Sequence, residues 1–184
     1  LRFAVDKKKN LFEPQDFHFE YLRSTLLPLI KRNIQLQLDS GVEIVMIFDS
    51  GLGDLNSELF KNKYIPLIKD LANSFPYKVG YYSKGKNLEE VKLISDFNFA
   101  GLGIDSNLDI INFFSSYENG FIQGNFDESK MLLNEKDLLK EIHLYCDKIQ
   151  DYGSAKGWVC GLGHGVNKIT PEKNIHLFID IIRK

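Results

Sequence analysis

The feature that most constrains the fold is a regular alternation of short apolar runs with segments of helical periodicity. Each apolar run has about five to seven residues, a length typical of strands in a buried sheet. Short strands that alternate with helices form parallel sheets with right-handed crossovers, so the sequence predicts an α/β fold. The predicted strands are residues 42–48, 77–82, 99–104, 120–124 and 158–162.

The intervening helices carry recognisable start and stop signals. Pro28 should kink or break the first helix, and Gly41 should end it. Asn87 and Asn134 precede helical patterns and are expected to cap them, and Thr170-Pro171 opens the last helix. The predicted helices are residues 16–40, 57–74, 88 onward, 108–114, 135–150 and 171 onward.

Polar or glycine residues follow nearly every predicted strand. In a barrel these strand ends converge on the face that carries the active site. A GxGxxG motif does not follow the first strand, which argues against a nucleotide-binding doubly wound sheet. The strand ends are Asp49-Ser50, Ser83-Lys84-Gly85, Asp105-Ser106, Gln123-Gly124-Asn125 and Gly163-His164-Gly165.

We therefore predict a (β/α)8 TIM-type barrel, of which this chain supplies roughly the last five β-α units. A complete barrel needs eight strands and about 250 residues. Residues 1–184 are interpreted as a single domain whose N-terminal part is missing, and we expect a longer native protein. The first residue, Leu1, is consistent with this expectation.

Composition excludes several classes of protein. Hydrophobic residues make up 43%, charged residues 26%, and the net charge is -2, so we expect no nucleic-acid partner. No apolar run approaches the ~20 residues that span a membrane, and we expect a cytoplasmic protein. Cys146 and Cys160 form no CxxC pair, so the sequence predicts two free thiols and no metal site.

Three segments resemble the uroporphyrinogen decarboxylase family. The first is Ile47-Phe48-Asp49-Ser50, which resembles the family's strand that ends in Phe-Asp/Glu-Ser. The second, Gln123-Gly124-Asn125-Phe126-Asp127, is similar to Gln-Gly-Asn-Leu-Asp-Pro. The third, Gly161-Leu162-Gly163-His164-Gly165, is similar to Asn-Leu-Gly-His-Gly. Their order and spacing agree with the family, and the resemblance covers nearly the whole chain.

The resemblance implies a carboxy-lyase of haem and porphyrin biosynthesis. Such an enzyme removes the four acetate carboxyls of uroporphyrinogen III as CO2 and yields coproporphyrinogen III. It needs neither a metal nor an organic cofactor, because the protonated pyrrole serves as the electron sink. The resemblance also implies a homodimer. The catalytic aspartate and the arginines belong to the family's N-terminal half, so the catalytic residues of this chain are unknown.

The residues carried over from the family are Ser50 and His164, both as substrate-binding groups at the barrel mouth. Asp49, Asp105 and Asn125 are expected to support them. Each also has a structural interpretation. Ser50 suits a turn that bonds its own backbone, His164 suits a cap on the last turn, and Asp105 suits an Asx-turn.

This chain departs from the family at several positions. Phe3 aligns with a family tyrosine near the active site, and the other departures are Gly51, Ser106, Glu128 and Gly161. These departures leave open an alternative hypothesis, in which the chain is a diverged, non-catalytic barrel fragment that binds a tetrapyrrole or a partner protein. A corrinoid-dependent methyltransferase shares the barrel, but it requires a His-x-Cys motif that is absent here, so zinc would lack ligands.

Overall fold

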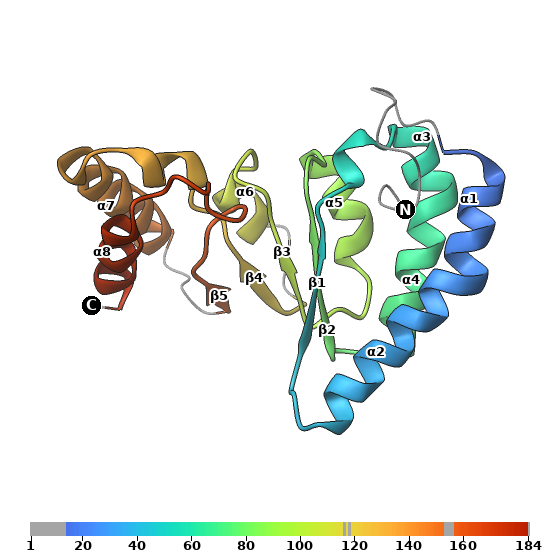
Figure 1. Ribbon diagram of the computed structural model, residues 1–184. Coiled ribbons are helices and arrows are strands. Elements are labelled where there is room, and N and C mark those ends of the chain that lie inside the picture. Colours follow the sequence, from blue (N-terminus) through green and yellow to red (C-terminus); the bar gives the residue numbers. More distant parts are fainter. Residues whose placement is uncertain (1–13, 116, 118, 153–156, 184) are drawn as a thin grey trace. The chain divides into compact units, whose positions relative to one another are not determined.

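The computed structural model describes residues 14–115, 117, 119–152 and 157–183. Five parallel strands alternate with helices along the chain, as the sequence predicts (Figure 1). The chain divides into two compact units, Leu1–Leu102 and Gly103–Lys184. Each unit is described separately below.

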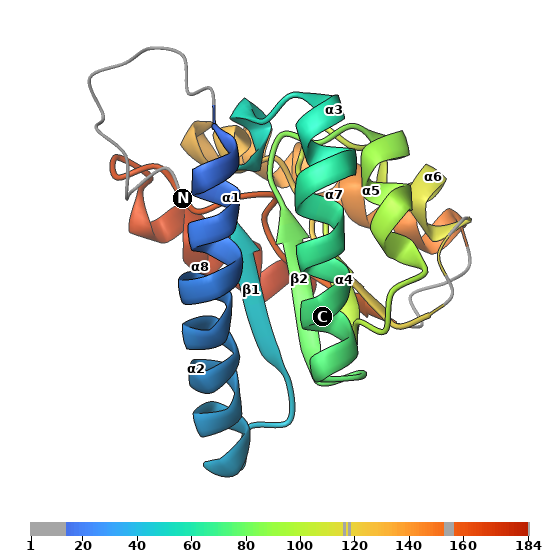
Figure 2. The same cartoon turned by 90° about the vertical axis from the view of Figure 1, so that its right-hand side faces the viewer.

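The first unit places helices on one face of two paired strands. Strand β1 runs parallel to β2, with Val45 opposite Val79 and Asp49 opposite Ser83. Helices α2, α4 and α5 lie over the same face of this pair (Figure 2). Its elements are α1 (Asp16–Tyr21), α2 (Leu27–Asp39), β1 (Val45–Asp49), α3 (Ser57–Leu59), α4 (Ile65–Ser74), β2 (Val79–Ser83) and α5 (Leu88–Ser95).

Both long helical segments of the first unit contain a π-helical turn just before a proline. The turn Leu22–Leu26 precedes Pro28, and the turn Phe60–Tyr64 precedes Pro66. Proline lacks an N–H and its ring clashes with the carbonyl four residues earlier, and a wider turn accommodates both effects. At Pro28 the predicted kink or break takes the form of this π-helical turn, and the helix continues to Asp39. The prediction of a helix over residues 57–74 is confirmed, with a π-helical turn before Pro66 that the sequence did not predict.

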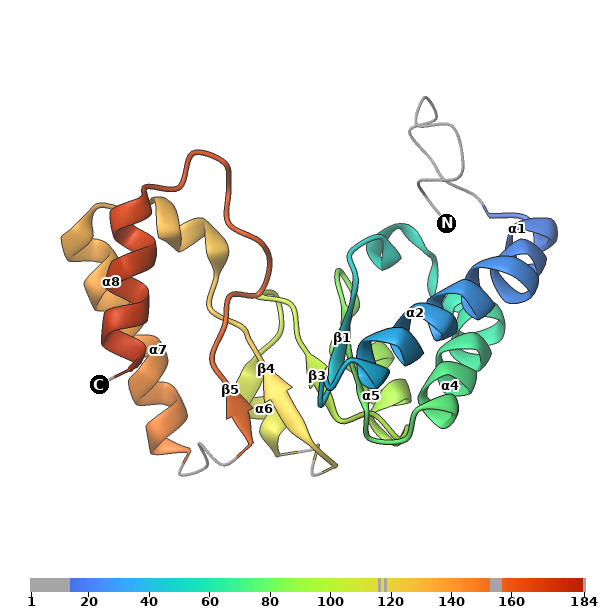
Figure 3. The same cartoon turned by 60° about the horizontal axis from the view of Figure 1, so that its bottom comes forward.

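The second unit begins within β3 and ends with two packed helices. Strand β4 runs parallel to β5, with Ile122 opposite Trp158. Helices α7 and α8 lie side by side (Figure 3). The elements are β3 (Gly101–Gly103), α6 (Ile110–Phe114), β4 (Phe121–Gln123), the 3-10 helix η5 (Glu128–Leu132), α7 (Glu135–Asp151), β5 (Trp158–Val159) and α8 (Glu172–Ile182).

The hydrophobic core of the second unit lies between α7, α8 and the segment after β4. Phe126 packs against Phe178 of α8, with ring centroids 5.1 Å apart. Met131, Leu138 and Ile142 complete the buried cluster. This core fixes the segment that follows β4, and therefore the strand end that carries Asn125.

Helix caps follow the sequence closely, whereas the strands are shorter than predicted. The side chains of Asn87 and Asn134 accept hydrogen bonds from the first turns of α5 and α7, which confirms both caps. Pro171 is the N-cap of α8 and not its first helical residue. The predicted last strand spans residues 158–162, but only Trp158–Val159 form a ladder, followed by one bridge from Leu162 to Phe126.

Among the described residues, no helix is both long enough and apolar enough to cross a membrane.

Candidate functional site

Asp49 is the last residue of β1, and two tyrosine hydroxyls hold its carboxylate. Tyr64 and Tyr81 both donate to Asp49 Oδ2, Tyr81 at 2.9 Å. Removal from water raises the pKa of Asp49, and the two tyrosine hydrogen bonds partly offset that rise. Both tyrosines belong to the first unit, so the hydrogen bonds that hold the Asp49 carboxylate all lie within that unit. The supporting role of Asp49 in a substrate site stays a prediction.

Ser50 follows Asp49 and begins the loop that connects β1 to α3. Its side chain is exposed, and the next turn, Leu52–Asp54, buries Leu52. An exposed hydroxyl at a strand end can donate to a ligand carboxylate. The predicted contact of Ser50 with substrate stays a prediction.

The loop that follows β2 packs directly against the Ser50 loop. The backbone N–H of Lys84 donates to the Asp49 carbonyl at 3.1 Å. A methyl group placed on Gly85 would lie 2.8 Å from the Gly53 Cα, and Gly85 has a φ of +71°. Only glycine satisfies both conditions without strain. The loop after β1 and the loop after β2 are therefore in direct backbone contact with each other.

In the second unit, Asn125 fastens the loop that follows β3. Its Nδ2 donates to the Asp105 carbonyl at 2.9 Å and to the Leu108 carbonyl at 2.7 Å. The Asp105 carboxylate accepts the Asn107 N–H at 3.3 Å, which makes the Asx-turn considered for it. Asp105 and Asn125 are both buried. The structure brings these two predicted residues together, and their role in supporting the substrate site stays a prediction.

Two aromatic side chains hold the backbone beside Asn125. The Tyr145 hydroxyl and the Trp158 indole N–H both donate to the Gly124 carbonyl, at 2.6 and 2.7 Å. The Asn125 N–H in turn donates to the Tyr145 hydroxyl. Burial raises the pKa of Tyr145, so the hydroxyl stays protonated and continues to donate. The end of β4 is therefore held rigidly.

His164 lies in the loop that follows β5, half-buried, next to a glycine in close contact. A methyl group placed on Gly163 would lie 2.3 Å from the Ser106 nitrogen. The Gly163 N–H donates to the Phe126 carbonyl at 2.8 Å. The loops after β3, β4 and β5 therefore meet within the second unit, and His164 extends from this junction. Its contact with substrate stays a prediction.

Sequence reasoning missed the tyrosines that support the site. Tyr64, Tyr81 and Tyr145 lie within predicted helices or strands, where aromatic residues usually fill the core. A core position is also the expectation for Trp158, but it is half-buried and donates a hydrogen bond. The sequence offers no local signal for these contacts, because each joins residues at least 15 positions apart. Phe3 lies outside the described residues.

The two cysteines are free thiols, as predicted. Burial raises the pKa of Cys160 to about 12, and it also raises the pKa of Cys146. In the described part of the chain, no three metal-ligating side chains gather.

Comparison with known proteins gives a consistent result. The family model described as uroporphyrinogen decarboxylase (URO-D) matches residues 6–184. The uroporphyrinogen decarboxylase of Orientia tsutsugamushi (strain Ikeda) is 28% identical over 156 residues, which cover 82% of this chain and 45% of that protein. The one from Rickettsia bellii is 29% identical over 182 residues, covering 96% and 52%. That of Picrophilus torridus is 26% identical over 175 residues, covering 95% and 51%.

This chain thus spans about half the length of the curated relatives it matches. The matched region contains all three segments on which the resemblance rests, and each ends a strand or extends from one. The chain belongs to the uroporphyrinogen decarboxylase family.

Proposed function

We propose that the native protein containing this chain decarboxylates the four acetate side chains of uroporphyrinogen III and yields coproporphyrinogen III. The observation that carries the proposal is the family match over residues 6–184, with Ser50 and His164 both on strand-end loops. Parallel α/β folds bind their ligands at the carboxyl ends of the strands.

In this reaction, the bond between an acetate methylene and its carboxyl carbon breaks. CO2 leaves, and the electron pair of the broken bond passes into the protonated pyrrole. The methylene then takes up a proton and becomes a methyl group, and the ring carbon releases the proton that it had gained, so that the neutral pyrrole is restored. The groups that protonate the pyrrole belong to the part of the family outside this chain. No metal or organic cofactor enters this scheme.

The residues of this chain hold the polycarboxylate in place. The Ser50 hydroxyl donates to a substrate carboxylate, and a ring N–H of His164 donates to another. Asp49, Asp105 and Asn125 keep the two loops in position through the contacts described above. The chain contains only four arginines, at positions 2, 23, 32 and 183, so further cationic groups must come from outside it.

We further propose that the native protein is a complete TIM-type barrel and a homodimer in the cytoplasm. These features follow from family membership. The parallel strand-helix alternation supports the barrel.

A turnover assay tests the proposal. The native protein is incubated anaerobically with uroporphyrinogen III, and the products are oxidised and separated by their number of carboxyl groups. The expected products carry seven down to four carboxyls in sequence. Unchanged eight-carboxyl substrate would contradict the proposal.

A non-catalytic tetrapyrrole-binding protein is the second candidate. It is favoured by the departures from the family at Gly51, Ser106 and Gly161, which all lie on the strand-end loops. Binding of uroporphyrin without any loss of carboxyls would support it. The methyltransferase alternative is not proposed, because the sequence has no His-x-Cys motif and the described residues hold no group of three metal-ligating side chains.

A further inference from the structure

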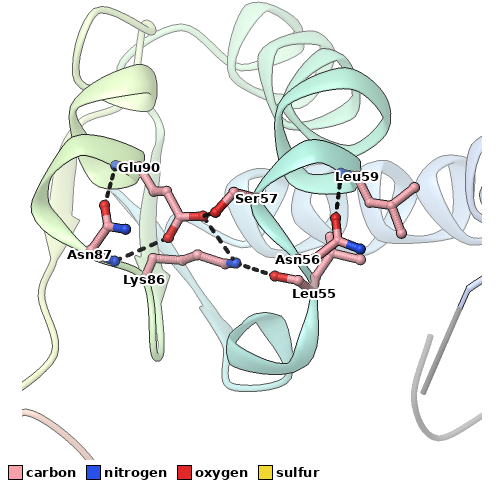
Figure 4. A network of polar contacts seen from close by, with 7 residues as sticks. All are labelled: Leu55, Asn56, Ser57, Leu59, Lys86, Asn87 and Glu90. Atoms are coloured by element: carbon pink, nitrogen blue, oxygen red, sulfur yellow. Dashed lines mark hydrogen bonds and ion pairs between the residues drawn. The ribbon is translucent and has the colours of Figure 1, made fainter. Parts of the chain in front are cut away.

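Lys86 is a buried lysine at the end of the loop that follows β2. Its side chain is only 2% exposed. Its Nζ donates to the Leu55 carbonyl at 2.6 Å and lies 3.5 Å from Glu90 Oε1 (Figure 4). The same Nζ lies 4.8 Å from the centre of the Phe60 ring. A buried cation is costly unless its charge is matched, and these three contacts match it.

Glu90 supplies the opposite charge. Its carboxylate also links the N-terminus of α3 to the N-terminus of α5. Its carboxylate accepts the Ser57 hydroxyl at 2.7 Å and the Asn87 N–H at 3.2 Å (Figure 4). Burial alone would raise its pKa, but the bonds from Ser57 and Asn87 and the charge of Lys86 lower the pKa of Glu90 overall. The carboxylate is therefore ionised and pairs with Lys86.

The hydrogen bonds of Lys86 and Glu90 hold the C-terminal end of the Ser50 loop in place. The loop runs from Ser50 to Asn56, and Asp49 is fixed at its first end. At its second end, Lys86 holds the Leu55 carbonyl and Glu90 holds Ser57, the first residue of α3. The contact between Gly53 and Gly85 lies between these two ends.

A buried ion pair is a weak source of stability, because desolvation offsets most of its attraction. Apolar side chains of similar size would fill the same space as well. What they would lack is a donor directed at the Leu55 carbonyl. The geometry therefore points to a role in placing the loop.

We propose that Lys86, with Glu90, is a positioning residue that fixes the Ser50 loop for binding of the tetrapyrrole carboxylates. This inference rests on the proposed function. The experiment measures the order of the loop separately from the activity. The positioning role and the proposed function can therefore fail independently.

The informative variants are Lys86→Met and the double variant Lys86→Met/Glu90→Gln. The single variant leaves a buried carboxylate unpaired and should lower the Tm strongly. The double variant removes both charges, and the introduced glutamine side chain can still accept from Ser57, so most of the Tm should return. Both lack the donor to Leu55. Lys92→Met is the matched control, because Lys92 lies on α5 and pairs with Glu89 in an exposed ion pair.

Hydrogen exchange in the native protein measures loop order. The Leu55 N–H, which bonds to the Leu52 carbonyl at 2.9 Å, should exchange at least about tenfold faster in the double variant than in wild type. Amides of β1 should keep wild-type protection. Uroporphyrin binding and kcat/KM, measured well below each Tm, should both fall about tenfold in the double variant and stay unchanged in Lys92→Met.

Unchanged exchange in the loop would overturn the positioning role whatever the activity. Faster exchange with wild-type uroporphyrin affinity would overturn it as well. If wild type binds uroporphyrin but releases no CO2, the proposed function fails, and weaker uroporphyrin binding by the double variant still supports the role of Lys86.

Discussion

Asp49 combines a largely desolvated carboxylate with hydrogen bonds from two tyrosine hydroxyls. Since burial raises its pKa, the folded protein binds a proton there more readily than the unfolded chain does. The carboxylate therefore lowers stability at neutral pH and contributes to the placement of Ser50.

Replacing Asp49 by Asn should flatten the pH dependence of stability. Stability of wild type should fall as pH rises above the ordinary carboxyl value of about 4, because the folded state loses its extra proton there. The amide of Asn does not titrate. Urea unfolding at several pH values measures the difference between the two proteins, which should grow in favour of Asn as pH rises. Parallel profiles would show that Asp49 has no raised pKa.

Replacing His164 by Ala in the native protein should lower turnover of uroporphyrinogen at least about tenfold, which corresponds to ~1.4 kcal/mol of transition-state stabilisation. The imidazole is half-buried in the loop after β5 and is proposed to donate to a substrate carboxylate. His143→Ala, an exposed histidine on α7, is the control and should leave kcat/KM unchanged. Wild-type kinetics in His164→Ala would remove this residue from the site.

At the scale of elements, the glycines that flank His164 have different roles. Gly163→Ala should destabilise the protein by about 2 kcal/mol or more, because the new methyl group meets the Ser106 backbone and neither can move freely. Gly165→Ala should cost little, since no atom lies within 4 Å of the new methyl group. Thermal unfolding of the two variants makes the comparison. Equal shifts in Tm would contradict the close contact between these loops.

Helix α8 is attached to the rest of the second unit through Asn174. Its buried Nδ2 donates to the carbonyls of Met131 and Leu133, at 2.8 and 2.9 Å. Asn174→Ala leaves two buried carbonyls without this donor and should cost about 2–4 kcal/mol in unfolding free energy. Asn62→Ala, an exposed asparagine, is the control. A loss as small as that of the control would show that α8 is held by apolar packing alone.

Local signals explain which elements the sequence predicted well. Asn87 and Asn134 cap helices because their side chains reach amides three residues away, an interaction visible in the sequence. The π turn before Pro66 was missed, since the pattern of apolar residues continues across it. The strand ends at Asp105 and Asn125 were predicted as supports, yet the tyrosines behind Asp49 and Asn125 were not. Those contacts depend on tertiary packing, which no local pattern encodes.

At the scale of the whole molecule, the chain covers about half of its relatives and contains one set of strand-end loops in each compact unit. Ser50 belongs to the first unit and His164 to the second. In the proposed function, the acid that protonates the pyrrole lies outside this chain.

The most direct test is the release of CO2 by the native protein after dialysis against a metal chelator. We expect four CO2 per uroporphyrinogen III consumed, with coproporphyrinogen III as the final product and no added cofactor. No CO2 above the spontaneous rate from a folded protein that binds uroporphyrin would contradict the proposed decarboxylase function and would favour a tetrapyrrole-binding protein.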